Sequence, residues 1–246
     1  MLTAYLDESG IHEGDHLCVV AGFVGNNAQW EAFIADWIPA IRPRANLHMK
    51  DLRWNKHPKQ IASLLAKLGP IPHKYNLIPV GVSLHWKDYY SVDVENTGNK
   101  FVNPYVLCAV SCISAVLEEV VGKDDVYFVF DRQERLRKEA IQVIRDFSFD
   151  VCGIDSRFTG SDFINRSTTV CLDPADYLAY LVRERGIDAE SFKSKACASI
   201  MGTRGCYGGR IELDQLTSMV DWWKEDHSPS EIITDLAKRR FFRGPR

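Results

Sequence analysis

Hydrophobic runs separated by turn signals predict a succession of strands along the chain. Apolar runs at residues 2–6 and 17–24 flank a short polar turn, so we expect them to form a hairpin. Apolar residues alternate within 77–86, which is typical of a strand with one buried face. The unbroken apolar run at 126–130 is typical of a strand at the centre of a sheet. A fifth strand is expected between residues 151 and 158.

Apolar residues at helical spacing predict helices between these strands and after the last of them. Two helices fill an insertion at residues 26–70, and residues 186–246 form a C-terminal helical extension. Residues 159–162 and 202–209 are rich in polar residues or glycine, and we expect both to be loops. The expected helices span residues 28–38, 58–68, 101–121, 134–147, 174–185, 213–223 and 230–242.

The order of these elements, once the insertion is set aside, is that of the ribonuclease H fold. We therefore expect a single ribonuclease H-like α/β domain over residues 1–246, with a five-stranded mixed sheet and flanking helices. The first three strands should be antiparallel. The strand at 126–130 should lie beside the first strand and run parallel to it.

Composition and charge fit an ordinary globular protein. The 246 residues are 46% hydrophobic and 26% charged, which is enough for one sizeable core. A net charge of −3 argues against a surface covered in positive charge but leaves room for a local basic stripe. The chain begins directly with a strand, and it contains no apolar stretch of the roughly 20 residues that span a bilayer. We therefore expect a cytoplasmic protein with no membrane association.

Seven cysteines are scattered along the chain, and several lie inside apolar runs. A free cysteine in such a run behaves as a small hydrophobic residue. Cys108 and Cys112 have helical spacing, but no second pair completes a zinc site. We expect seven reduced thiols and no structural disulfide.

Three acidic residues fall where strands end or a helix begins. Asp7 ends the first strand, Asp131 ends the strand at 126–130, and Asp176 lies in the first turn of the helix at 174–185. Each alone has an ordinary explanation, as a turn residue or as an acid favoured at a helix start. Jointly they predict a carboxylate cluster, because adjacent strands bring their carboxyl ends together. Such a cluster suits Mg²⁺ or Mn²⁺, and paired ions can promote phosphodiester hydrolysis.

Two motifs and one looser segment resemble the family called domain of unknown function 3800. The opening Tyr5–Gly10, followed by Ala21–Val24, is similar to the start of that family. Leu172–Tyr180 resembles its second hallmark, in which an Ala-Asp pair enters a helix, and Leu47–Leu52 resembles its middle element. The resemblance covers about residues 1–185. It implies a ribonuclease H-like fold and a metal-dependent nuclease site.

The resemblance also implies roles for particular residues. Asp7, Asp131 and Asp176 would be the metal ligands, with Glu8 and His48 nearby. Glu8 should point away from Asp7 if the strand continues through it. For His48 two interpretations stay open: a polar loop residue, or a proton shuttle or phosphate contact, since a histidine titrates near neutral pH.

Two further acidic positions leave their assignment open. Asp173 stands where the second hallmark usually has glutamine, so it either adds a fourth carboxylate or caps the helix. The ribonuclease H pattern also places a glutamate on the first long helix. Glu118 and Glu119 lie near the far end of that helix, and Glu8 is an alternative for this ligand.

Basic residues gather at two places in the sequence. Arg132, Arg135 and Lys138 follow Asp131 on a predicted helix, where they form either a solvated face or a stripe that contacts nucleic-acid phosphates. The tail at 238–246 interleaves cations with aromatic residues, which suits base stacking or a partner contact. The C-terminal helices are therefore a candidate surface for a homo-oligomer or a protein partner.

These patterns favour a Mg²⁺- or Mn²⁺-dependent nuclease acting on RNA or an RNA/DNA hybrid. The alternative is a non-catalytic module that retains the fold and binds nucleic acid or a protein partner. A phosphatase with an aspartyl nucleophile is disfavoured, because Ser9 stands where that chemistry needs a second aspartate. A nucleotide-binding α/β protein is disfavoured too, since no glycine-rich phosphate loop follows a strand.

Overall fold

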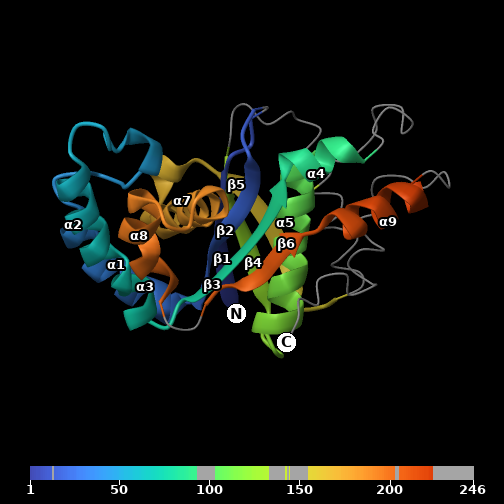
Figure 1. Cartoon of the computed structure of the whole chain (residues 1–246). Helices are drawn as coiled ribbons and strands as arrows, with labels where there is room; N and C mark the ends of the chain where they lie inside the picture. The colour runs from blue at the N-terminus through green and yellow to red at the C-terminus, as the bar shows by residue number, and fades with distance from the viewer. Residues whose placement is uncertain are drawn as a thin grey trace.

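Six strands form one mixed sheet in the order β5-β4-β1-β2-β3-β6 (Figure 1). β1 is antiparallel to β2 and parallel to β4, and β2 is antiparallel to β3, as the sequence predicts. β5 runs parallel to β4, and β6 runs parallel to β3. The strands span Leu2–Ser9 (β1), Leu17–Asn26 (β2), Ile78–His85 (β3), Val126–Asp131 (β4), Phe158–Ile164 (β5) and Tyr207–Ile211 (β6). The computed structural model describes residues 1–12, 14–92, 103–132, 142, 144, 155–202 and 205–223.

The sheet has six strands where the sequence predicts five, and the two differences from the prediction lie at the edges of the sheet. β6 occupies part of the expected loop at 202–209, and it places a strand within the predicted helical extension. β5 begins at Phe158, where the fifth strand was expected to end, and it runs through the polar residues 159–162. Edge strands bury few side chains, so their sequences lack the apolar pattern that reveals central strands.

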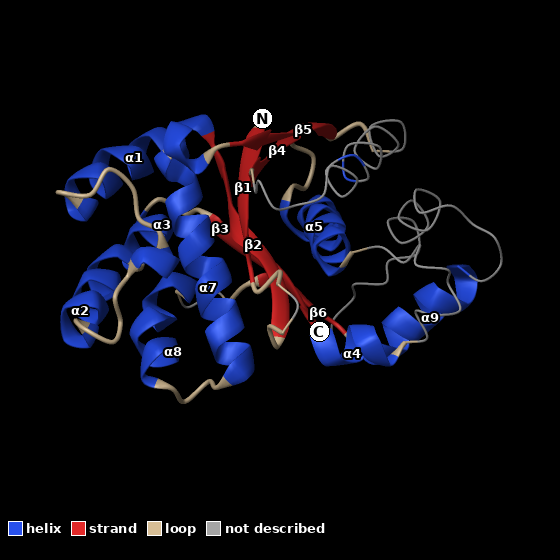
Figure 2. Cartoon of the chain, turned by 90° about the horizontal axis from the view of Figure 1, so that it is seen from above, coloured by secondary structure: helices blue, strands red, loops and turns tan. Residues whose placement is uncertain are grey.

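Helices cover both faces of the sheet (Figure 2). Within the described residues, the structure confirms the helices expected at 28–38, 58–68, 101–121, 174–185 and 213–223. The helices expected at 134–147 and 230–242 lie outside the described residues, apart from residues 142 and 144. The helices on the insertion face are α1 (Asn27–Ile41), α2 (Pro58–Leu68), α3 (Pro70–Lys74), α7 (Asp173–Ile187) and α8 (Phe192–Cys197). The other face carries α4 (Trp86–Ser91), α5 (Pro104–Ala115) and α9 (Leu213–Trp223). Short helical turns are η1 (Met49–Asp51), η3 (Val116–Val120), η4 (Arg166–Thr168), η5 (Val170–Leu172) and η6 (Ala198–Met201).

The sheet separates two hydrophobic clusters. Successive side chains of a strand point to opposite faces, so β1 sends Ala4 and Leu6 toward α5, and Tyr5 and Asp7 toward α7. α5 is buried along its whole length, and α7 packs across β1 and β2. The carboxyl end of β1 therefore lies between two buried helices, one on each face of the sheet.

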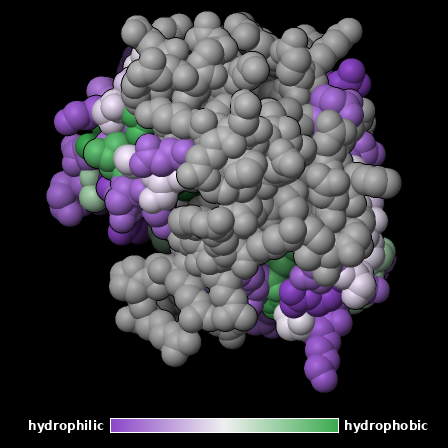
Figure 3. Space-filling model, turned by 90° about the vertical axis from the view of Figure 1, so that its right-hand side faces the viewer, coloured by the Kyte–Doolittle hydropathy of each residue, from purple (hydrophilic) through white to green (hydrophobic). Residues whose placement is uncertain are grey.

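The described helices include none that is long and apolar enough to cross a membrane. From the side of α9, the described side chains are mainly hydrophilic, with smaller hydrophobic groups between them (Figure 3). The described cysteines are all free, which agrees with the expected reduced thiols; Cys152 lies outside the described residues.

Candidate functional site

Asp7 and Asp131 lie side by side at the carboxyl edge of the sheet. β1 and β4 pair in parallel with Leu6 opposite Phe130, so the residues that follow in each strand are neighbours. Both carboxylate side chains belong to the face covered by α7, and both residues are almost completely buried, with exposed fractions of 3% and 4%. The strand ends thus bring two negative charges together out of contact with solvent.

Asp176 joins them from α7. Its position in the first turn of the helix places its carboxylate above the carboxyl end of β1, because α7 packs on β1 and β2. The backbone N–H of Met49 donates a hydrogen bond of 2.6 Å to its Oδ2 atom. This bond also ties the loop between α1 and α2 to the start of α7.

Arg166, on η4, links the three carboxylates. Its guanidinium donates from Nη2 to Asp7 Oδ2 at 2.9 Å, and it lies 3.5 Å from Asp176 Oδ2 and 3.9 Å from Asp131 Oδ2. The Arg166 backbone N–H also donates to Asp131 Oδ1 at 3.1 Å. The arginine side chain is only 12% exposed, so the ion pairs are largely shielded from solvent. Sequence reasoning missed this residue, since no local pattern distinguishes it from other arginines.

Burial raises the pKa of each of these carboxyl groups. The pKa of Asp7 lies well above its ordinary value because of burial first and the negative charge of Asp176 second; Arg166 opposes both. Burial raises the pKa of Asp176 to about 6, against the stabilising charge of Arg166. The pKa of Asp131 is raised as well, again mainly by burial. One guanidinium therefore offsets only part of the cost of holding three buried carboxylates.

Glu8 lies next to the cluster but on the opposite face of β1, as the alternation of the strand predicts. It is 8% exposed, and its Oε2 atom has no hydrogen-bond partner among the described residues. Burial and the neighbouring Asp7 charge raise its pKa well above the ordinary value. The buried hydroxyl of Tyr105, near the start of α5, also has no hydrogen-bond partner in the described part of the chain. Burial first and the charge of Glu8 second raise its pKa well above the ordinary value.

His48 lies at the edge of the site and is partly buried. Its Nδ1 atom is 3.3 Å from Asp51 Oδ2. Burial, followed by the positive charges of Arg166 and Lys50, lowers the pKa of His48 to about 4. At neutral pH the imidazole is therefore uncharged. In this state it offers one N–H donor and one acceptor but no positive charge for a phosphate.

Asp173 is a structural anchor in this arrangement. Its Oδ2 atom accepts hydrogen bonds from Trp37 Nε1 at 2.9 Å and from the Leu47 backbone N–H at 2.8 Å. It makes no capping bond at the start of α7, and burial raises its pKa to about 6. Both of its bonds reach the α1–α2 region, so Asp173 fixes that region against α7.

Other predicted residues lie away from the cluster or outside the described residues. Glu118 and Glu119 are exposed at the far end of the α5–η3 segment, so neither supplies the ligand expected from the first long helix. Arg132 is exposed just after β4, and its backbone N–H donates to Ile164 O at 2.8 Å. Arg135, Lys138 and the basic tail fall outside the described residues, and their contact with nucleic acid stays a prediction.

Over the described residues, no group of three or more His, Cys, Asp or Glu side chains is arranged as a ready metal-binding set. The three carboxylates are instead spaced around a planar guanidinium, which is wider than an ion with ligand distances near 2.1 Å. The sequence matches no model of a known protein family, and no curated protein matches it either.

Proposed function

We propose that the chain is a metal-dependent nuclease that hydrolyses phosphodiester bonds in an RNA strand or an RNA/DNA hybrid. One observation carries the proposal: Asp7, Asp131 and Asp176 come from three separate elements, yet all three face the same cationic group. A buried acidic cluster is costly unless cations neutralise it, so its presence needs a functional reason.

The sheet supports a ribonuclease H-like fold for this proposal. Five neighbouring strands run in the order β5-β4-β1-β2-β3, with the first three strands antiparallel and β4 and β5 parallel to β1. This is the arrangement that we expect from the resemblance to the domain of unknown function 3800 family. β6 extends the sheet beyond β3 and does not disturb that order.

The carboxylates supply the oxygen ligands that a hard divalent cation such as Mg²⁺ or Mn²⁺ prefers, and they would bind it by closing from the wider spacing around Arg166. The Oδ2 atoms of Asp7, Asp131 and Asp176 all lie within 3.9 Å of the Arg166 guanidinium, so a cation in its place would face three oxygen ligands. Burial first, and then the charges of nearby Asp7 and Asp131, raise the pKa of Glu8, and its Oε2 atom accepts no hydrogen bond from the described residues. A bound Mg²⁺ or Mn²⁺ would polarise the phosphate and lower the pKa of an attacking water.

The chain's own residues position the reactants around this centre. Asp7 and Asp131 are held by the sheet, and Asp176 by its bond from Met49, so the backbone keeps the three carboxylates at one place. The guanidinium of Arg166 pairs with the carboxylates. It can pair with a substrate phosphate instead, because a phosphate offers the guanidinium the same negative charge and oxygen geometry as a carboxylate does. Neutral His48 accepts a proton or a hydrogen bond from water at the rim of the site.

A second candidate function is a non-catalytic module that binds nucleic acid or a protein partner. The Arg166 ion pairs favour it, because they already neutralise part of the acidic charge without a metal. In that case Asp7, Asp131 and Asp176 would serve to hold η4 in place, and metal would not alter binding.

A cleavage panel separates the two candidates. Single-stranded, duplex and hybrid RNA and DNA would be incubated with wild type, Asp7→Asn and Asp176→Asn, with EDTA, Mg²⁺ or Mn²⁺. We expect metal-dependent cleavage by wild type, and a loss of orders of magnitude in both variants together with weaker metal binding by calorimetry. Equal cleavage by all three proteins would exclude the cluster as the active site. Metal-independent binding without cleavage would support the module.

A further inference from the structure

A cleft of about 680 Å³ lies between the α1–α2 loop and α2. His48 lines the cleft, and the following residue, Met49, donates its backbone N–H to Asp176. One short segment thus forms a wall of the cleft on one side and contacts the carboxylate cluster on the other. The volume is within the range of pockets that bury a small organic ligand, about 300–1,000 Å³.

The cleft combines an apolar floor with a cationic rim. Ile61 and Leu64, on α2, supply apolar surface, and Ile61 is 6% exposed. Arg44 and Arg53 are exposed at the rim, and neither guanidinium forms an ion pair with another described residue. The acid at the rim, Asp51, faces His48 at 3.3 Å. The rim therefore offers free positive charge in a chain whose net charge is −3.

The cleft is held rigidly in relation to the cluster. Asp173 binds the Leu47 backbone N–H, and its neighbour on α7, Asp176, binds that of Met49. Trp37 Nε1 donates to the same Asp173 carboxylate and so fixes α1 as well. A ligand in the cleft would therefore have a defined position relative to Asp176.

We propose that this cleft binds one unpaired nucleotide of the substrate strand, adjacent to the phosphate that is cut; the inference rests on the proposed nuclease function. Arg44 and Arg53 pair with the backbone phosphate, as guanidinium groups pair with two phosphate oxygens. Ile61 and Leu64 contact the flat face of the base, and the amide of Gln60 faces its polar edge. A base that is paired within a helix cannot enter such a cleft. The inference therefore narrows the proposed substrates to single RNA strands and to hybrids with an unstacked nucleotide beside the cut.

Binding without cleavage tests the cleft directly. Fluorescein-labelled RNA and DNA pentanucleotides of mixed sequence would be titrated in EDTA against wild type and the double variant Arg44→Gln/Arg53→Gln. We expect at least a tenfold loss of affinity, and a log–log salt slope that falls by about 0.7, since the two arginines share one phosphate and each neutralised single-strand phosphate contributes about 0.7. Uridine 5′-monophosphate should displace the probe at a tenfold lower concentration than inorganic phosphate does.

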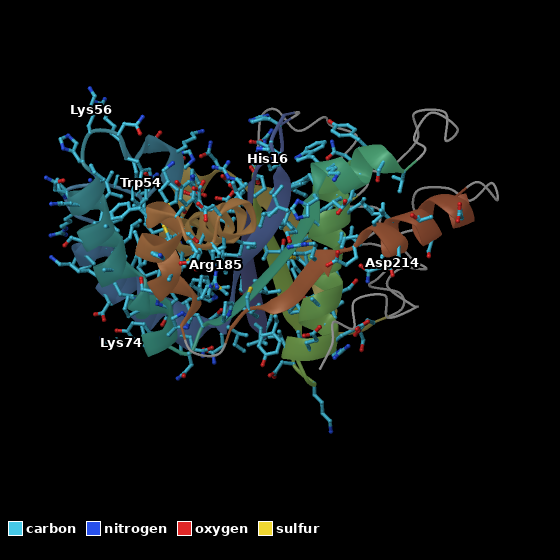
Figure 4. All side chains as sticks on the ribbon, viewed as in Figure 1. His16, Trp54, Lys56, Lys74, Arg185 and Asp214 are labelled. Atoms are coloured by element: carbon cyan, nitrogen blue, oxygen red, sulfur yellow. The ribbon has the colours of Figure 1, made fainter. Side chains whose placement is uncertain are left out.

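The matched control is Lys56→Gln/Lys59→Gln. It removes the same charge from the same part of the chain, but neither lysine lines the cleft, and Lys56 points outward from the α1–α2 loop (Figure 4). We expect the control to retain binding to within about threefold. An equal loss of affinity in the control would show that binding depends on general electrostatic attraction, and it would overturn the assignment of the cleft as the binding site. Equal competition by inorganic phosphate would reduce the cleft to an anion site and overturn the nucleotide assignment.

The outcomes keep this inference separate from the proposed nuclease function. If Arg44→Gln/Arg53→Gln binds and cleaves like wild type, the cleft does not bind the nucleotide, and the proposed nuclease function is unaffected. If wild type cleaves nothing but its binding of the pentanucleotides depends on the two arginines, the nucleotide-binding cleft is supported and the proposed nuclease function is excluded. If wild type binds neither pentanucleotide, the cleft is overturned. Urea unfolding of the variants checks that they fold, and we expect wild-type curves because both arginines are exposed.

Discussion

We predict that Asp176→Asn makes the metal-free protein more stable at neutral pH. The substitution keeps the shape of the side chain, and the new amide oxygen can still accept the bond from Met49. It removes one of the carboxylates that face Arg166. Because the folded state raises the pKa of Asp176, the ionised form is disfavoured by folding, and deprotonation destabilises the native protein.

The size of the effect follows from the pKa. Asp176 is 7% exposed, and its pKa rises from 3.8 to about 6 on folding, a difference of about 2 units. At 1.36 kcal/mol per unit, ionisation costs about 3 kcal/mol of stability. This part of the stability is fully present below about pH 4 and is lost as the pH rises through 6. Asparagine does not titrate, so the variant should match wild type at pH 4 and exceed it by about 3 kcal/mol at pH 7.

Urea unfolding in EDTA between pH 4 and 7.5 measures this difference. Asp36→Asn is the control of opposite sign: Lys74 and the Tyr75 hydroxyl lower the pKa of exposed Asp36 by hydrogen bonding. Its contribution is present above about pH 4 and is lost only at lower pH, so this variant should be less stable than wild type by a nearly constant amount across the whole range. A difference between Asp176→Asn and wild type that does not change with pH, or a less stable variant at pH 7, would refute the reasoning.

Three further predictions concern the support of the site. Arg166→Gln should destabilise the metal-free protein by about 3–5 kcal/mol at pH 7, and Mg²⁺ should restore part of the loss in a thermal shift assay. Trp37→Phe removes the indole donor to Asp173 and should cost about 1–3 kcal/mol in urea unfolding, without a change in the pH dependence due to Asp176. Alkylation under denaturing, non-reducing conditions should modify seven thiols by mass; a reproducible bridged peptide would contradict this.

The central part of the fold and the convergence of Asp7, Asp131 and Asp176 followed from the sequence. β1 to β4 carry apolar patterns that reflect burial on one or both faces, and that signal is local in the chain. A strand that ends in an acid places this acid at the carboxyl edge of the sheet, so Asp7 and Asp131 could be paired once their strands were taken as neighbours. Asp176 was placed through its helix start and the family resemblance.

Only the tertiary structure decided what surrounds those acids. Arg166 lies 159 residues from Asp7 along the chain, and Asp173 lies 136 residues from Trp37. Neither contact can be predicted from the spacing of residues within a short segment. The edge strands β5 and β6 were misplaced or missed because few of their side chains are buried. The α1–α2 loop, which lines the cleft, is held against α7 by hydrogen bonds from its backbone to Asp173 and Asp176. Periodicity and capping signals come from neighbours in sequence, whereas the partners of a buried charge are chosen by packing between distant segments.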